Sequence, residues 1–191
     1  FATVPDPEPI PVKTHFENAR NRVLAHGRAT GNELAVLVDG RTGETLESKE
    51  GTNKAVHFTD SMMALLSDPA QSVRIFHNHP SSSSLSSADL LICTHPGAES
   101  IEAVGHDGSR YRGKPLIKDR VLLEKVIESA NSAVLDKFQL LYNSGQLTID
   151  QVQTNHWHAV NKALAHANVI EYEFLLSSER NDSMNSLGAL F

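Results

Sequence analysis

The sequence is poor in three features, and each absence excludes a class of protein. It contains one cysteine, Cys93, among 191 residues, so it cannot form an internal disulfide bond. No apolar run approaches the length of about 20 residues that a membrane-spanning helix needs. The net charge is −6 and no basic block is present, so a nucleic-acid-binding surface is not expected, because phosphate contacts need clustered positive charge.

The composition is that of an ordinary soluble globular protein. Hydrophobic residues make up 40% of the chain and charged residues 21%. A chain of 191 residues is long enough for a sizeable core and suits one domain, or one domain with a helical extension. The ten histidines are a high number, so the charge of the protein will change as the pH falls through the histidine range.

The first twelve residues form a proline-rich segment. Four prolines alternate with other residues between positions 5 and 11, which predicts an extended, semi-rigid linker over residues 1–12. The chain begins at Phe1 and not at Met, and it shows no signal peptide. We therefore expect a terminal module of a larger protein, about whose targeting the missing signal peptide says nothing. A cytosolic site of action is compatible with the single cysteine, with delivery as part of a larger secreted protein as one route.

Residues 13–116 have the patterns of a mixed α/β unit. Strands are predicted over residues 33–39, 44–48, 54–58, 72–79, 100–104 and 109–112, with a hairpin turn at Asp107-Gly108. Helices are predicted over residues 14–26 and 86–93, and one helix is capped by Thr59 or Asp60 and carries Met62, Met63, Leu65 and Leu66. The predicted fold class is therefore α/β, with a mixed sheet flanked by helices.

Residues 117–176 are predicted to add a pair of helices. Apolar residues recur at helical spacing from Leu122 to Leu141, and the segment 143–145 ends that pattern. Thr148-x-x-Gln151 is a capping-box pattern that opens a second helix. The tail from residue 177 to residue 191 is polar and weakly patterned.

The clearest functional signal is His77-Asn78-His79-Pro80. On a β-strand, residues i and i+2 point to the same face, so both imidazoles could reach one cation. Pro80 cannot donate a backbone hydrogen bond and is expected to mark the end of this strand. One strand histidine on the surface and one in the core would be the simpler interpretation of these two side chains.

Asp89 is the expected third ligand of a metal ion. Two histidines and one carboxylate with an open coordination position form a catalytic zinc arrangement. Ser86-x-x-Asp89 also fits a helix N-cap with an acid at N3, which needs no metal. The two interpretations are compatible, because a helix start can hold the aspartate rigidly while it faces the histidines, and Ser87 is an equally good cap.

Glu33 precedes the first strong strand, where an isolated glutamate is usually an exposed flank. Glu33 becomes a functional candidate only if it lies beside a zinc site. A zinc-activated water needs a base to take its proton, and a leaving amine needs an acid. One carboxylate can serve in both roles in turn.

Together these residues resemble a known family. Glu33, then His77-x-His79-Pro80, then Ser86-x-x-Asp89 is similar to the motif of the JAMM (also JAB or MPN+) zinc metalloproteases. The run from Phe76 to Ser81 is similar to the RadC branch of that superfamily. The resemblance covers residues 14–112 and not the C-terminal helices.

The resemblance implies a role for each motif residue. His77, His79 and Asp89 would bind one Zn²⁺ per chain, Glu33 would act as general base and then as acid, and Ser86 would stabilise the oxyanion. The implied reaction is hydrolysis of a peptide or isopeptide bond, typically one that joins ubiquitin or a ubiquitin-like protein to lysine. The implied fold is a mixed sheet between helices, like that of cytidine deaminases.

One spacing departs from the family pattern. Six residues separate His79 from Ser86, where the family usually has seven. At seven residues Ser87 would take the serine role and Leu90 the aspartate position, but leucine cannot bind zinc. We therefore keep Ser86 and Asp89 and expect a shortened loop.

Other histidines and the cysteine are weaker candidates for ligands. His95 and His106 lie nearby in sequence, and Cys93 is four residues after Asp89 on the same helix face, where a small core residue is the simpler interpretation. His156 and His158 repeat the two-residue spacing inside a helical pattern, where they point about 200° apart and cannot share a metal. Trp157 between them is expected in the core.

The resemblance also implies partners and alternatives. A protein substrate is expected, and no membrane or nucleic acid. JAB-like domains occur as C-terminal modules of secreted bacterial toxins and in phage proteins, so the C-terminal helices could cover the sheet, gate the cleft or bind an inhibitor or immunity protein. The alternatives are a non-catalytic MPN-type binding module and a RadC-like protein associated with DNA.

Overall fold

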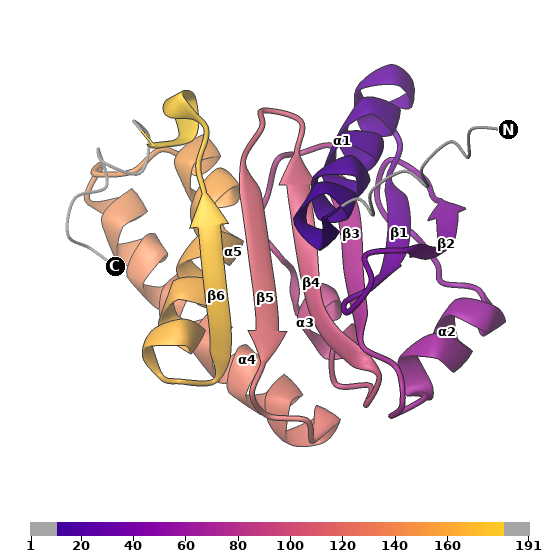
Figure 1. Ribbon diagram of the computed structural model, residues 1–191. Helices are drawn as coiled ribbons and strands as arrows, with labels where there is room; N and C mark the ends of the chain where they lie inside the picture. The colour runs from indigo at the N-terminus through magenta and orange to yellow at the C-terminus, as the bar shows by residue number, and fades with distance from the viewer. Residues whose placement is uncertain (1–10, 182–191) are drawn as a thin grey trace, which may run out of the picture.

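The computed structural model describes residues 11–181, which form one six-stranded mixed sheet with helices on both faces (Figure 1). The strand order is β2-β1-β3-β4-β5-β6. Only β3 and β4 run parallel, and the other neighbouring pairs are antiparallel. The predicted fold class, α/β with a mixed sheet between helices, is confirmed at this level.

The elements follow one another along the whole described chain. Their bounds are α1 (Val12–Thr30), β1 (Leu34–Asp39), β2 (Thr45–Glu50), α2 (Asp60–Ser67), β3 (Val73–His79), α3 (Ser87–Ile92), β4 (Ala98–Gly105), β5 (Arg110–Pro115), α4 (Arg120–Asn143), α5 (Ile149–His166) and β6 (Ile170–Leu175).

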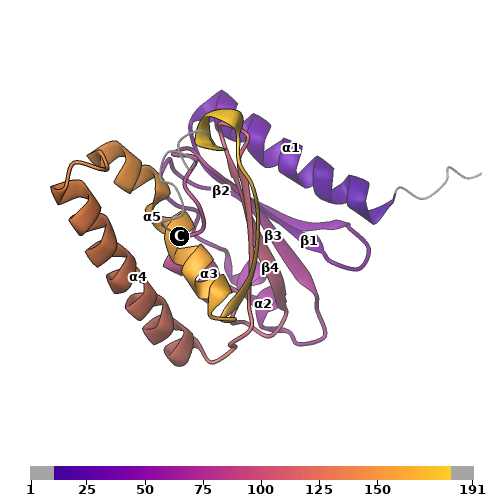
Figure 2. The ribbon, with the colours of Figure 1, turned by 90° about the vertical axis from the view of Figure 1, so that its left-hand side faces the viewer.

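Helices cover both faces of the sheet (Figure 2), and a hydrophobic core lies on each face. On one face α1 packs with Phe16, Ala19 and Val23, which share one side of a helix. These residues meet the even-numbered side chains of β1 together with Phe76 and Val104. The odd-numbered side chains of β1 face the larger core, which α2, α3, α4 and α5 cover. The sheet thus separates an α1 side from an α3 side.

β3 lies near the middle of the sheet, between β1 and β4. Its register with β1 pairs Ala35 with His77, and its register with β4 pairs His79 with Gly105. The strand ends at His79, directly before Pro80, as the sequence predicts. Because its last residues are buried among neighbouring strands, their side chains have fixed directions.

Residues 54–58 are not a strand, so that prediction was wrong. The chain leaves β2 through Gly51 and returns on itself, with the Thr52 amide donating to the Ala55 carbonyl. The segment 53–58 is a loop on the edge of the sheet, and no backbone ladder pairs it with a strand. α1 is also longer than predicted, because it begins at Val12, directly after the Pro11 N-cap.

The C-terminal part contains the predicted helical pair and one strand that the sequence analysis missed. α4 and α5 are as expected, and the capping box of Thr148 and Gln151 is present. β6 then pairs antiparallel with β5 along its full length. Residues 117–176 are therefore not a purely helical extension, because their last strand completes the sheet. The alternation of Ile170, Tyr172 and Phe174 with two glutamates is the signal that could have indicated it.

The segment after β6 folds back on the sheet instead of forming a polar tail throughout. A helical turn starts at Ser178, and Arg180 is buried with 5% of its surface exposed. The rest of the predicted tail, 182–191, and residues 1–10 of the predicted linker lie outside the described residues. Within residues 11–181, the helices are all too short or too polar to cross a bilayer.

Gly27 allows α1 to approach the sheet closely, which leads to a stability prediction. A Cβ at this position would lie 2.3 Å from Asn78 Nδ2 and 2.3 Å from His106 Nε2. We expect Gly27→Ala to lower the free energy of unfolding by about 1–3 kcal/mol through overpacking, although alanine is the better helix former. Urea denaturation measures the change.

The exposed Ala25 on the same helix provides the matched control for this substitution. Ala25→Gly reports helix propensity alone and should cost up to about 1 kcal/mol. A stabilised Gly27→Ala variant would show that the close contact does not constrain the fold.

Candidate metal centre

The two histidines at the end of β3 point to the α3 side of the sheet. Their ring centroids are 4.5 Å apart, and His77 and His79 are buried, with 5% and 7% of their surfaces exposed. This is the arrangement that the two-residue strand period predicts. The structure therefore brings both imidazoles to one place, and neither is the surface residue of the simpler interpretation.

Asp89 reaches the histidines from the first turn of α3. Its Oδ1 lies 3.7 Å from His77 Nε2, and its Oδ2 lies 3.7 Å from His79 Nε2. Ser86 is the N-cap of α3 and forms a complete capping box with Asp89. Both the Ser86 amide and its hydroxyl donate to Asp89 Oδ2 at 2.7 Å. The helix start thus orients the carboxylate toward the rings, and both predicted roles of this pattern coexist.

Hydrogen bonding leaves the Nε2 atoms of both rings available to a ligand. His79 Nδ1 lies 2.9 Å from the Ser83 carbonyl oxygen, which can only accept, so Nδ1 carries the proton and Nε2 a lone pair. His77 Nε2 is buried and has no hydrogen-bond partner among the described residues. The ligand atoms of His77, His79 and Asp89 all lie within 4.8 Å of one another, so this triad could hold a metal ion.

The charges of the triad also suit a cation. Burial lowers the pKa of His77 to about 4, against an opposing effect of Asp89, so this ring is neutral at physiological pH. Burial alone would raise the pKa of the Asp89 carboxyl, but His77, His79 and the Ser86 hydrogen bonds outweigh it and lower the pKa. A neutral imidazole beside an ionised carboxylate is the protonation state that metal binding requires.

Glu33 lies beside the triad but is not part of it. It directly precedes β1, and continuing the β1–β3 register places it opposite His79. It is 8% exposed and lines the same cavity as the two histidines. Burial raises the pKa of its carboxyl, and Asp89 adds to this while His79 opposes it. A carboxylate with a raised pKa is better suited to accept and return a proton.

Asn78 fixes the backbone on both sides of Glu33. It lies between the two histidines and points to the opposite face of the sheet, where it is fully buried. Its Oδ1 accepts from the Leu34 amide at 2.8 Å, and its Nδ2 donates to the Asn32 carbonyl at 2.9 Å. The strand that carries the triad's histidines therefore also holds the segment that carries Glu33.

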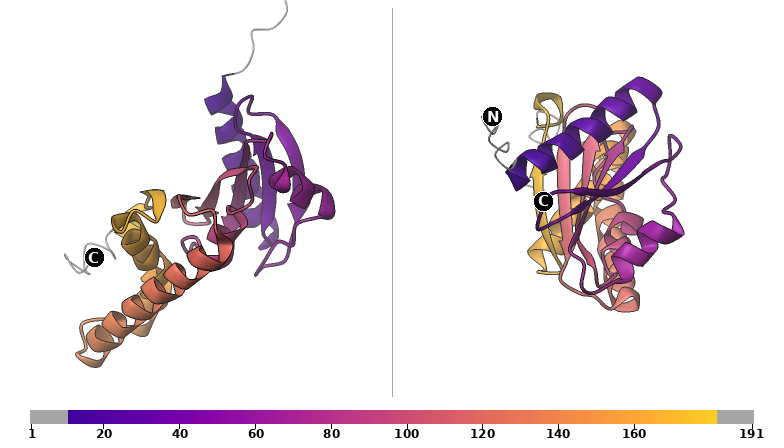
Figure 3. Two further views of the ribbon diagram at one scale, coloured as in Figure 1. Left: turned by 90° about the horizontal axis from the view of Figure 1, so that it is seen from below. Right: turned by 45° about the vertical axis from the view of Figure 1, so that its right-hand side comes forward.

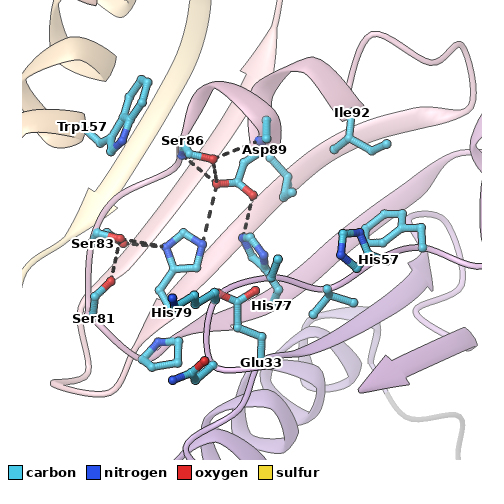
Figure 4. A pocket seen from close by; sticks show the side chains of 18 of the residues that line it. Glu33, His57, His77, His79, Ser81, Ser83, Ser86, Asp89, Ile92 and Trp157 are labelled. Carbon is cyan, nitrogen blue, oxygen red and sulfur yellow. Dashed lines mark hydrogen bonds and ion pairs between the residues drawn. The ribbon is translucent and has the colours of Figure 1, made fainter. Parts of the chain in front are cut away.

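The cavity around these residues has a volume of about 690 Å³ (Figure 4). One wall is the loop 53–58, which replaces the strand predicted there, and His57 and Phe58 line it. Trp157 of α5 lines the opposite rim, although it also packs against the larger core as expected. Sequence reasoning missed both walls, because neither carries a local signal that relates it to the histidines.

The structure shows which of the other candidate residues lie at the cavity and which lie elsewhere. Ser86 lines the cavity, whereas Ser87 does not. His106 contacts Asn78 on the α1 side, and His95 contacts Ser67 and does not join the triad. Cys93 is fully buried in the larger core, as predicted, and burial raises the pKa of its thiol to about 12. His156 and His158 belong to α5, and the two rings do not join the triad.

Comparisons with known proteins give no relative. No protein-family model, no curated protein and no solved structure matches this chain significantly.

The role of Asn78 predicts a loss of stability on its replacement. Asn78→Leu keeps a similar volume but leaves the Leu34 amide and the Asn32 carbonyl without partners. Each buried unpaired group costs about 1–3 kcal/mol, so we expect a loss of that size or more in urea denaturation. Asn21→Leu, at an exposed position of α1, is the control and should change stability little. Equal effects of the two substitutions would contradict the role of Asn78.

The lowered pKa of His77 predicts a pH dependence of the metal-free protein. The unfolded chain binds a proton at His77 near pH 6.5, and the folded chain only near pH 4. Stability is therefore lost as the pH falls from about 6.5 to about 4, by up to about 3 kcal/mol. Thermal unfolding across this range in the presence of a chelator measures it. In His77→Gln the loss should be smaller by this amount, and an unchanged profile would contradict the prediction.

Proposed function

We propose that this chain is a zinc-dependent hydrolase of the JAMM type, which cleaves peptide or isopeptide bonds. The observation that supports this best is the convergence of His77, His79 and Asp89 in one cavity with Glu33. The order of these residues along the chain is similar to that family, and the motif spacing departs from it only in the loop before Ser86, which is one residue shorter. The sheet with helices on both faces agrees with the JAB fold that the resemblance implies.

The donor set fits zinc better than magnesium or calcium. Two imidazoles and one carboxylate are zinc ligands, whereas the harder cations prefer oxygen ligands throughout. The unpaired, buried Nε2 of His77 is the kind of atom that a metal would satisfy. A zinc ion held there would act as a Lewis acid and would lower the pKa of a water molecule bound to it.

The residues of the chain would divide the remaining chemistry among them. Glu33 accepts a proton at its carboxylate and returns it to the leaving amine, and partial burial raises its pKa toward the range that both steps need. The Ser83 carbonyl holds the tautomer of His79. Ser86 stabilises the oxyanion, for which its hydroxyl must turn away from Asp89 Oδ2 toward the substrate.

The substrate would be a protein, and a ubiquitin-like one is what the resemblance implies. The cavity of about 690 Å³ has a mixed lining, in which apolar side chains such as Phe58, Met63 and Trp157 lie around the polar triad. Such a cleft can hold an extended chain segment across the reacting groups. An inhibitor or immunity protein would act by covering the same cleft.

The two alternative functions are less well supported. A non-catalytic binding module would not need three ligand atoms within 4.8 Å of one another and a buried glutamate beside them. A DNA-associated protein would need clustered positive charge, and the net charge is −6.

Metal analysis tests the proposed cofactor. Protein purified without chelator should contain about one zinc per chain, as a single three-ligand site requires. His77→Ala and Asp89→Ala should each lose it. His57→Ala, which changes a histidine of the same cavity outside the triad, should keep it. Zinc-free wild-type protein that does not bind added zinc would contradict the proposal.

Activity tests the role of Glu33. Glu33→Gln should retain zinc but lower the rate of cleavage by roughly 100-fold to 10,000-fold, because proton transfer is lost. Isopeptide-linked ubiquitin dimers and linear peptides serve as substrates. Glu50→Gln, an exposed acid at the end of β2, is the matched control and should leave the rate unchanged. Full activity of Glu33→Gln would remove Glu33 from the mechanism.

A further inference from the structure

The loop that joins His79 to Ser86 is held by residues far away in the sequence. It contains four consecutive serines and has few apolar side chains to anchor it. Ser82 adopts a left-handed conformation with a φ of 55°. Hydrogen bonds within the loop join the Ser82 amide to the His79 carbonyl and the Ser81 hydroxyl to that of Ser83, and contacts from outside add to them.

The first anchor comes from α5 and from β6, the edge strand of the sheet, which lies next to α5 (Figure 3). The Ser84 hydroxyl is buried and lies 2.7 Å from the Tyr172 hydroxyl of β6. Asn161 of α5 donates from Nδ2 to Ser84 Oγ at 3.0 Å and to the Leu85 carbonyl at 2.8 Å. His158 Nδ1 lies 2.7 Å from the Tyr172 hydroxyl and fixes its position.

The second anchor comes from the helical turn after β6. Arg180 donates from Nη2 to the Ser82 carbonyl at 2.7 Å and from Nε to the Tyr111 hydroxyl at 3.1 Å. Its guanidinium is almost completely buried, with 5% of the residue exposed. A buried cation directed at a backbone carbonyl is costly unless its hydrogen bonds are made, so this contact helps to hold Ser82. The Ser82 hydroxyl also accepts from the Asp107 amide at 3.1 Å, and the Ser82 amide donates to the His79 carbonyl at 2.9 Å.

The two anchors flank the contacts that orient the metal ligands. Ser83 lies between the anchored residues Ser82 and Ser84, and its carbonyl holds His79 Nδ1. Ser86 follows the anchored Leu85 directly, and it holds the Asp89 carboxylate. Two of the three ligands are therefore oriented by Ser83 and Ser86, whose neighbours in the chain are bound by the C-terminal segment.

We propose that α5, β6 and the turn after it act as a clamp that pre-organises the metal centre through the serine loop. Asn161, Tyr172 and Arg180 are its positioning residues. This inference rests on metal binding by His77, His79 and Asp89, as in the proposed function. The C-terminal segment is then a part of the site itself, and not only a cover for the sheet.

Apolar side chains in the larger core would be enough to stabilise the fold. The polar side chains that contact the serine loop therefore point to a positioning role. Tyr172, His158, Asn161 and Ser84 form a connected network within the larger core, where every member must be oriented. Such a network specifies one geometry of the loop, whereas apolar packing would allow several.

The affinity for a metal ion tests the clamp in variants that each remove only a few atoms from it. Tyr172→Phe removes one oxygen and keeps the ring, and Asn161→Ala removes both donors to the loop. Replacing groups that orient metal ligands typically weakens affinity about 10-fold to 100-fold, so we expect at least roughly a tenfold rise in the Kd of each variant. Titration with Co²⁺ measures the Kd, and the visible absorption band of the bound ion reports its coordination geometry.

Two matched controls separate positioning from stability. Tyr142→Phe changes an exposed tyrosine of α4, and Asn155→Ala removes a fully buried asparagine of α5 that donates to the Gln151 carbonyl of its own helix. Asn155→Ala should lower stability but leave the Kd and the cobalt spectrum unchanged. Tyr142→Phe should change neither.

The outcomes distinguish the clamp from the proposed function. If the wild-type protein binds Co²⁺ and the Tyr172 and Asn161 variants bind it equally well with the same spectrum, the clamp is wrong and the proposed function stands. If the wild-type protein binds neither Co²⁺ nor Zn²⁺, the proposed function fails and the clamp fails with it. Hydrogen exchange of the loop 80–86 in the metal-free protein adds a second measure: it should be faster in both variants, and unchanged exchange would overturn the clamp.

Discussion

The alternation of side chains at the end of β3 is the constraint on which the rest of this structure depends. Because β3 is hydrogen-bonded on both sides, its residues cannot rotate, and each side chain must face one side of the sheet or the other. His77 and His79 face α3, and Asn78 faces α1. A shift of one residue in register would place Asn78 in the cavity and bury both histidines against α1.

The polar groups of the site are positioned mainly by backbone contacts. Asn78 holds the amide and the carbonyl on either side of Glu33. The Ser83 carbonyl holds His79, and the Ser86 amide holds Asp89. Since backbone groups move only with their elements, the site is as rigid as the junctions between β1, β3 and α3.

The electrostatics of the site are compatible with a bound cation. Burial keeps His77 neutral and raises the pKa of Glu33, while Asp89 stays ionised beside the two imidazoles. The centre thus places imidazole lone pairs beside an ionised carboxylate that its neighbours stabilise. Buried lone pairs and an ionised carboxylate on one side of a cavity could hold a metal ion.

The sequence by itself determined those features that depend on neighbours along the chain. The two-residue period placed His77 and His79 on one face, Pro80 marked the end of the strand, and the Ser86-x-x-Asp89 pattern predicted the cap of α3. The helical pair of residues 117–176 followed from spacing in the same way. These signals are local, because strand alternation and helix capping involve residues at most four apart.

Only the tertiary structure decided how these parts meet. The loop 53–58 has strand-like residues but no partner strand, whereas Ile170–Leu175 becomes β6 because β5 offers it a free edge. Trp157 lies at the cavity rim, and Tyr172 and Arg180 contact the serine loop. These contacts join residues that are about 70 to 100 positions apart along the chain. No local pattern encodes such contacts, since they depend on long-range packing of strands and helices around the sheet.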